Sequence, residues 1–281
     1  MNIQWYPGHM AKTKRLMLES ISLVDIVIEL LDARIPISSQ NPEIDNLTKN
    51  KLRVVILNKS DLSDERYNVK WKAHFESQGI KVIFVNSIKG VGISEIETVC
   101  RELMKEKIER LRARGRIFVP IRAMICGIPN VGKSTLINKY VGKAMTKTGD
   151  RPGVTRSNQW VKIRKDFELL DTPGILWPKF EDQDVGLNLA FCGAIKDDIM
   201  DMYSLSLKLI EKLQALYPEA LKNRYKIEVF EEDSLEKILE KIAEARGFKM
   251  KGNELDLDRA SIILIDEFRA AKLGKITLEH V

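Results

Sequence analysis

The sequence predicts an α/β domain followed by an all-α domain. In the first part of the chain, apolar runs of strand length alternate with segments of helical spacing. A glycine-rich run at Gly127–Thr135 follows one such strand, and only helical patterns follow Pro178. The 281 residues are enough for two domains of ordinary size. We therefore expect one domain at residues 1–178 and a second at residues 179–281.

Three apolar runs predict strands of a parallel sheet. They span Asp25–Leu31, Leu52–Leu57 and Lys81–Val85, and the segment Tyr67–Gln78 before the third run has helical character. Near-continuous apolar runs are typical of strands buried on both faces, and their alternation with helices indicates βαβ units.

The segments around the glycine-rich run extend this pattern. Ile117–Cys126 is the predicted strand before the run, although Pro120 can break it, and a helix is expected at Lys133–Tyr140. A hairpin is expected at residues 160–163 and 168–170.

Further helices are predicted from apolar spacing and end signals. Ser94 and Glu97 have the spacing of a capping box, which indicates a helix running toward Leu111. The C-terminal helices are expected at residues 205–216, at 235–242 with Asp233 as cap and Gly247 as stop, and at 258–273.

The run Gly127–Thr135 fits the pattern G-x-x-x-x-G-K-[ST] of a phosphate-binding loop. Its glycines let successive N–H groups point at phosphates, Lys133 supplies positive charge, and the Ser134 hydroxyl can bind Mg²⁺. A plain strand-to-helix turn is the alternative. The loop residues expected to bind nucleotide are Asn130, Val131, Gly132, Lys133, Ser134 and Thr135.

The tetrapeptide Asn58-Lys59-Ser60-Asp61 follows a predicted strand and suits guanine. The Asp61 carboxylate can accept from the exocyclic amino group and the ring N–H of guanine, a pair of donors that adenine lacks. Asp61 therefore disfavours an ATP-using enzyme. Asn58 can bond the opposite edge of the base, and the Lys59 stem can pack over the ring. Ser87, after the third strand, is expected behind the base, with a polar turn as the alternative.

The segment Asp171–Gly174 follows the predicted hairpin and suits Mg²⁺ and the γ-phosphate. The Asp171 carboxylate would hold Mg²⁺ through water, and the Gly174 N–H would meet the phosphate. Thr155 is the candidate switch threonine, and Thr146 and Thr148 are nearby alternatives. The predicted Mg²⁺ ligands are Ser134, Thr155 and Asp171.

The order of these motifs along the chain is rotated, because the base motif precedes the phosphate-binding loop. With the opening segment Trp5–Lys12, this order resembles the circularly permuted GTPases of the ribosome biogenesis GTPase A family. The resemblance implies a circularly permuted P-loop GTPase domain with a C-terminal all-α domain. It also implies a Mg²⁺-dependent hydrolase of GTP to GDP that acts late in large-subunit assembly. The precursor of that subunit would be the partner of the GTPase and would stimulate hydrolysis. Hydrolysis of GTP would in turn time the release of the GTPase from the precursor.

The residue that positions the attacking water is not supplied by these motifs. Many GTPases place glutamine directly after the Asp-x-x-Gly segment, but here that position is Ile175, so slow intrinsic hydrolysis is expected. The resemblance points to His9 as the catalytic residue, since a neutral imidazole can orient water. A structural role is the alternative for His9 and the assignment for His74 and His280.

A potassium ion is a further candidate cofactor. In P-loop GTPases of similar sequence, asparagine at the position of Asn130 ligates K⁺, which supplements Mg²⁺. Loop geometry alone is the alternative, and equal hydrolysis rates in potassium and sodium would exclude the ion.

The net charge of +6 is unevenly distributed. Through Pro178, 30 Lys and Arg face 19 Asp and Glu, whereas the remainder has 16 against 21. A basic first domain suits ribosomal RNA, with Arg112–Arg116 as one candidate contact. The alternative is a GTP-dependent signalling switch that recruits a protein effector through the helical domain.

Cysteine usage and hydropathy suggest a compartment. Cys100, Cys126 and Cys192 lack metal-ligand spacing and are expected to be reduced packing residues. No stretch approaches the ~18 uninterrupted apolar residues of a membrane span, and no signal-peptide core is evident. We therefore expect a cytoplasmic protein without a membrane span.

Overall fold

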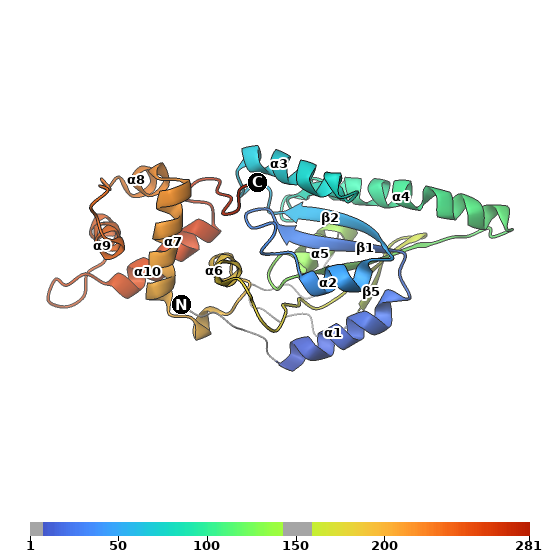
Figure 1. Ribbon diagram of the computed structural model, residues 1–281, viewed down its shortest axis with the longest axis horizontal. Helices are drawn as coiled ribbons and strands as arrows, with labels where there is room; N and C mark the ends of the chain where they lie inside the picture. Colours follow the sequence, from blue (N-terminus) through green and yellow to red (C-terminus); the bar gives the residue numbers. More distant parts are fainter. Residues whose placement is uncertain (1–7, 143–158) are drawn as a thin grey trace.

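The computed structural model describes residues 8–142 and 159–281 (Figure 1). Within these residues, the first part of the chain forms a six-stranded sheet with the order β3-β2-β1-β4-β6-β5. All neighbouring strands are parallel except β5, which pairs antiparallel with β6 at one edge. The predicted α/β class is confirmed. The strands are β1 (Ile26–Asp32), β2 (Leu52–Asn58), β3 (Lys81–Val85), β4 (Ile121–Gly127), β5 (Gln159–Arg164) and β6 (Phe167–Asp171).

Helices pack on both faces of this sheet. Because side chains alternate along a strand, Leu31 and Val55 point to one face, where they pack with Trp71 of α3. Ile56 points to the other face and belongs to a larger cluster that includes Ile96 of α4. The helices of this part are α1 (Gly8–Ile21), α2 (Pro42–Thr48), α3 (Glu65–Ser77), α4 (Ile93–Ala113) and α5 (Lys133–Val141).

The C-terminal part is helical, and α7, α8, α9 and α10 lie apart from the sheet in Figure 1, with α6 between the two parts. Helix α10 packs against α7 and α9, and buried Leu209, Ile242 and Leu264 contribute to the core. The helices of the C-terminal part are α6 (Gln183–Phe191), α7 (Met202–Leu216), α8 (Glu219–Tyr225), α9 (Leu235–Arg246) and α10 (Leu257–Arg269), with a 3₁₀ turn at Asp197–Ile199. Across the described ranges, no helix is both long enough and apolar enough to cross a membrane.

The last residues of the chain return to the sheet domain. The backbone N–H of Ile276 donates to Leu62 (3.2 Å), and that of Leu278 donates to Arg34 (2.8 Å). The half-buried Glu279 carboxylate accepts from the N–H groups of Ile37 (2.7 Å) and Ser38 (2.9 Å). A division at residue 178 therefore stays a prediction, and this terminal segment packs against the first part.

Several predicted element ends are wrong for local reasons. The strand before the glycine-rich run begins at Ile121, directly after Pro120. Helix α4 begins at Ile93 with Gly92 as its N-cap, so the expected capping box at Ser94 does not form. Helix α10 ends at Arg269 rather than residue 273, because Ala271 adopts a positive φ of 53°.

The cap of α9 is also shifted by one residue. The Ser234 hydroxyl accepts from the N–H of Lys237 (3.2 Å), whereas Asp233 accepts from the N–H of Phe230 (2.8 Å). Both side chains can satisfy backbone donors, and position relative to the first turn decides which one caps. Gly247 does end this helix, as predicted, and it adopts the left-handed conformation.

The three cysteines are buried and free, as predicted. Burial raises the pKa of Cys100 and of Cys192 to about 12, so neither thiol is reactive near neutral pH. They act as packing residues.

Candidate nucleotide site

The loops that carry the motifs all leave the same edge of the sheet. Because β1, β2, β4 and β6 are parallel, their carboxyl ends lie side by side. Asp32 is in register with Asn58, and Asp171 is in register with Ile125, two residues before Gly127. The base motif, the phosphate-binding loop and the Asp171 segment therefore converge.

Two glycines of the phosphate-binding loop stand where no side chain fits. At Gly127 (φ +149°) an added Cβ would lie 2.4 Å from the carbonyl oxygen of Leu30. At Gly132 (φ +103°) it would lie 2.4 Å from Nδ2 of Asn58. The loop can thus curl against two neighbouring strands. Helix α5 begins at Lys133, so its first N–H groups end in the loop, an arrangement that suits an anion.

The Lys133 side chain is folded over the loop and buried. Its ammonium donates to the carbonyl oxygens of Gly127 (3.0 Å) and Ile128 (2.9 Å). Burial lowers the pKa of Lys133 to about 8, against the opposing effect of the Asp171 carboxylate. A bound phosphate would favour the charged ammonium and raise this pKa.

Asn58 joins the base motif to two other loops. Its Nδ2 donates to the carbonyl oxygen of Val131 (2.7 Å), and its Oδ1 accepts from the N–H (3.2 Å) and hydroxyl (2.7 Å) of Ser87. The sequence suggested that Asn58 binds the base directly. In the structure its carboxamide holds the phosphate-binding loop and the Ser87 loop together.

Lys59 is anchored by a buried ionic network. Its ammonium lies 3.0 Å from Oδ2 of Asp32, and Arg34 donates to both oxygens of the same carboxylate (2.9 and 2.8 Å). Burial by itself would raise the pKa of Asp32, but Arg34 and Lys59 hold it well below its usual range. The carboxylate is therefore charged, and it fixes a lysine whose own backbone has a positive φ of 57°.

Ser60 and Asp61 complete this motif. The N–H and hydroxyl of Ser60 both donate to the carbonyl oxygen of Val85 (3.3 and 3.2 Å), which ties the motif to the end of β3. The Asp61 carboxylate is half-buried, and no hydrogen bond or ion pair engages it among the described residues. It is thus available to the donors of a guanine ring.

Asp171 has the character expected of a cation ligand. It is fully buried at the end of β6, and neither carboxylate oxygen has a hydrogen-bond partner within the described part of the chain. Burial raises the pKa of Asp171 to about 6, although the charge of Lys133 opposes this. Two orphaned carboxylate oxygens beside a phosphate-binding loop fit Mg²⁺, which prefers oxygen ligands.

Gly174 and Ile175 lie against the phosphate-binding loop. A Cβ at Gly174 would lie 2.8 Å from the backbone N and Cα of Pro129, so only glycine allows this approach. The Ile175 N–H donates to Gly127 (3.3 Å), and its carbonyl accepts from Nδ2 of Asn41 (3.3 Å). The Ile175 side chain is buried in the core and cannot orient water.

Asn130 contacts the segment that follows α6. Its backbone has a positive φ of 56°, and its Nδ2 donates to the carbonyl oxygen of Gly193 (2.9 Å), just beyond α6. Ser134 and Thr135 lie half-buried in the first turn of α5, and their roles at phosphate and Mg²⁺ stay predictions.

Some predicted site residues lie outside the described residues. Thr155, with its alternatives Thr146 and Thr148, belongs to these. His9 lies in α1 by its backbone, but its side chain is not among those described. Of the other two histidines, His280 stacks on Tyr67 with ring centroids 3.7 Å apart, which suits a packing role.

Asp32 and Arg34 belong to the site but were missed as such by motif reasoning. The sequence placed them only at the end of a predicted strand. A signal was available, because charged residues directly after a buried parallel strand lie at the edge where ligands bind. What the sequence could not supply was their partner, Lys59, in the loop after the next strand.

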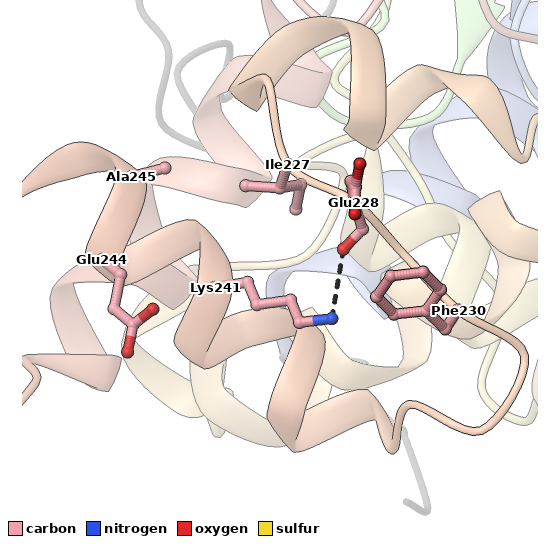
Figure 2. Close-up of a pocket in the computed structure, with 6 residues that line it drawn as sticks. All are labelled: Ile227, Glu228, Phe230, Lys241, Glu244 and Ala245. Carbon is pink, nitrogen blue, oxygen red and sulfur yellow. Dashed lines mark hydrogen bonds between the residues drawn. The ribbon is translucent and has the colours of Figure 1, made fainter.

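A separate hollow lies in the helical part (Figure 2). It has a volume of about 440 Å³ and is lined by Ile227, Glu228, Phe230, Lys241, Glu244 and Ala245. The Lys241 ammonium donates to the carbonyl oxygen of Glu228 (3.1 Å) and lies 4.8 Å from the centre of the Phe230 ring. None of the motif residues lines this hollow, so it is not the nucleotide site.

Known proteins resemble this chain over nearly its whole length. Residues 122–241 match the family described as 50S ribosome-binding GTPase. Ribosome biogenesis GTPase A of Bacillus pumilus is 49% identical over 279 residues, which cover 99% of each chain.

Two solved structures are also similar to this chain. The GNP-bound structure of YlqF from T. maritima has a TM-score of 0.63 and 27% identity, with 96% of this chain and 98% of that chain covered. A GDP-bound structure of TM YlqF has a TM-score of 0.67 and 26% identity, with 93% and 97% covered. The fold is thus that of a circularly permuted P-loop GTPase, and the chain belongs to the ribosome biogenesis GTPase A family.

Proposed function

We propose that this GTPase binds the precursor of the large ribosomal subunit, promotes a late step of its assembly and hydrolyses GTP to time its release. The observation that carries the proposal is the 49% identity to a ribosome biogenesis GTPase A over 99% of both chains. The convergence of the three motif loops at one sheet edge supports it. The cytoplasm would be the site of action.

Each group at the sheet edge has a chemical part in this proposal. Asp61 would accept the two donors of guanine, and Lys133 would leave its carbonyl partners for the phosphates. Ser134 and Asp171 would hold Mg²⁺, with Thr155 as a third ligand. Mg²⁺ neutralises charge on the phosphate oxygens when bound. The orphaned oxygens of Asp171 are the structural support for that assignment.

Water positioning is assigned to His9. The buried side chain of Ile175 leaves the usual glutamine position without a polar group, and α1 begins at Gly8, next to His9. We expect His9→Ala to lower the subunit-stimulated hydrolysis rate by about 10²- to 10⁴-fold, as is typical for loss of acid–base catalysis, with GTP affinity unchanged. Loss of GTP binding instead would assign His9 a structural role.

Asn130 is the proposed K⁺ ligand. We expect hydrolysis to be several-fold faster in potassium than in sodium, and we expect Asn130→Gly to remove that difference, because glycine keeps the positive φ but has no side chain. Equal rates in the two salts would exclude the ion.

A basic surface for RNA is available at the end of α4. We call it the α4 tip, and it consists of Arg110, Arg112, Arg114, Arg116, Ile117 and Phe118. In Figure 1 the helix runs past the strands, away from the helical part. Ile117 is 98% exposed and Phe118 is 52% exposed. Phosphates would neutralise the arginines, and an exposed aromatic ring can stack on an unpaired base.

GTP turnover by the purified protein in potassium buffer, with and without large ribosomal subunits, tests the proposal. We expect a slow basal rate that subunits raise at least tenfold, because the site is completed on its target. Small subunits serve as the control. An unchanged rate with large subunits would favour a signalling switch that recruits a protein effector.

A further inference from the structure

One arginine of the helical part, Arg269, holds the end of another helix. It is the last residue of α10, and its guanidinium donates to the carbonyl oxygens of Ala190 (2.8 Å) and Phe191 (3.0 Å) at the end of α6. Carbonyls at the end of a helix lack the donor that the next turn would supply, and that of Ala190 also accepts from the N–H of Gly193 (3.0 Å). Asp197 pairs with the other side of the guanidinium (2.7 and 2.8 Å). The end of α6 is thereby fixed against α10.

A first connection runs from Arg269 to the phosphate-binding loop. Gly193, just beyond α6, has a φ of +75°, and a Cβ there would lie 3.4 Å from Nε of Arg269. Gly193 therefore packs directly on the guanidinium. Its carbonyl oxygen accepts from Nδ2 of Asn130 (2.9 Å) in the loop. Arg269 thus positions Gly193, and Gly193 in turn positions Asn130 of the phosphate-binding loop.

A second connection runs from Arg269 to the base motif. Its backbone carbonyl accepts from Nη1 of Arg34 (3.2 Å), whose guanidinium also lies 5.5 Å from the centre of the Phe268 ring. The remaining nitrogens of Arg34 hold Asp32, and Asp32 holds Lys59. Arg34, Asp32 and Lys59 therefore contact one another in turn and join the end of α10 to the loop that would recognise guanine.

We propose that Arg269 is a positioning residue through which the helical part sets the geometry of both nucleotide-binding loops, so that a displacement of α10 changes GTP affinity. Buried, fully bonded polar networks offer few alternative arrangements, which lets a shift at one end reach the other. The inference rests on the proposed function only for the identity of the partner that displaces α10, the large ribosomal subunit.

The first test measures the affinity of the full chain for a fluorescent GTP analogue, without ribosomal subunits. Arg269→Ala should weaken binding about 5- to 20-fold, and Arg269→Lys should recover part of the loss, because lysine can still donate to one carbonyl of α6. The matched control is Arg224→Ala. Arg224 pairs with Glu267 of α10 through two bonds (2.6 and 2.9 Å), and those bonds reach neither α6 nor the loops. An Arg269→Ala affinity within twofold of wild type would overturn the proposal.

Double variants distinguish positioning from general loosening. If Arg269 acts through Asn130, the affinity loss of Arg269→Ala with Asn130→Gly will be smaller than the product of the two single losses. The second connection uses the backbone carbonyl of Arg269, which alanine keeps, so it is tested with Arg34→Lys, which lacks Nη1. That variant should lower the preference for GTP over ITP, which lacks the amino group assigned to Asp61. Strictly multiplicative losses would overturn the first connection, and an unchanged preference would overturn the second.

A milder variant covers the case in which Arg269→Ala does not fold. Asp197→Asn removes the carboxylate behind the guanidinium but leaves the α6 carbonyls and both loops intact, and Asp197 is half exposed. It should weaken GTP binding about twofold to fourfold, and an unchanged affinity would count against Arg269. Subunit stimulation of the wild-type chain is a separate result, so failure of the proposed function is recognised independently.

Discussion

Arginines at two regions of this molecule are used in opposite ways. At the nucleotide edge, Arg34 is 2% exposed and Arg269 is 20% exposed, and each forms several hydrogen bonds with neighbouring groups. At the α4 tip, the arginines are exposed, and no ion pair engages them among residues 8–142 and 159–281. Arg34 and Arg269 fix geometry, whereas the exposed arginines leave their charge to a partner.

The difference follows from solvation. A buried charge that loses its partner is strongly destabilising, so the network around Asp32 tolerates few arrangements. An exposed charge is already solvated by water and contributes little to stability, but it attracts an anion over about 10 Å at ordinary salt. The same residue type therefore supports precision at one end and association at the other.

If burial explains the difference between the two groups of arginines, removing one arginine from each group will change the free energy of unfolding by very different amounts. Arg34→Ala leaves the Asp32 carboxylate buried with only Lys59, so we expect it to lower the free energy of unfolding by about 3–5 kcal/mol. Arg114→Ala should change it by less than about 0.5 kcal/mol. Urea denaturation measures both, and equal effects would contradict the role given to burial.

The same contrast applies to two glycines. A Cβ at Gly174 would lie 2.8 Å from the Pro129 backbone, so Gly174→Ala must push two loops apart. Overpacking of this kind costs about 1–3 kcal/mol, and a loss of that size in binding free energy corresponds to roughly a 5- to 150-fold loss of GTP affinity. Gly115→Ala, beside the α4 tip, meets nothing within 4 Å, and its φ of +85° affects stability only. Isothermal titration with GTP would show whether Gly115→Ala binds normally, as we expect.

A buried carboxyl predicts a pH dependence that an exposed one lacks. Burial raises the pKa of Glu29 to about 7, although Arg53 opposes this, so the folded chain binds a proton that the unfolded chain releases near pH 4.5. The free energy of unfolding should therefore fall as pH rises from about 5 to 8, by on the order of 2 kcal/mol. Glu29→Gln should flatten this slope in urea titrations, and exposed Glu109→Gln should not. Retention of the slope in Glu29→Gln would assign it to another group.

The smallest effect on the isolated protein is expected at the α4 tip. Replacing Arg112, Arg114 and Arg116 by alanine should leave basal GTP turnover and stability unchanged. The salt dependence of binding to large subunits should fall, with the slope of log affinity against log salt reduced by about 2 to 3 if each arginine meets one phosphate. Three alanines at Lys208, Lys222 and Lys237 of the helical part, whose ammonium groups already pair with glutamates, provide a comparison that removes the same number of positive charges. An unchanged slope would remove the α4 tip from the RNA-binding surface.

Local patterns predicted much of the fold. The strands β1, β2 and β3 and the helix α5 were found because apolar runs and the glycine-rich run depend on neighbouring residues only. Helix ends were less predictable. Ser94 and Asp233 each had the right chemistry for a cap, but Gly92 and Ser234 occupy the cap positions, since the first turn is placed by packing.

The sequence predicted individual residues of the candidate site better than it predicted the hydrogen bonds between them. The motifs named Asp61 and Asp171 from residue type and spacing, and neither carboxylate has a hydrogen-bond partner among the described residues, so their roles stay predictions. Asn58 instead bridges Val131 and Ser87, and Asn130 reaches Gly193. Such pairings join residues far apart in sequence, and no local spacing specifies them.

The sequence by itself determined the family, the rotated order of the motifs and the side chains available for guanine, phosphate and Mg²⁺. These are properties of short segments, whose chemistry is fixed by residue type and spacing. The tertiary structure alone decided that Arg34, Asp32 and Lys59 form one network and that Arg269 adjoins both loops. The physical reason is that parallel strand pairing and helix packing bring distant residues into contact, and burial then makes each of those contacts strong and specific.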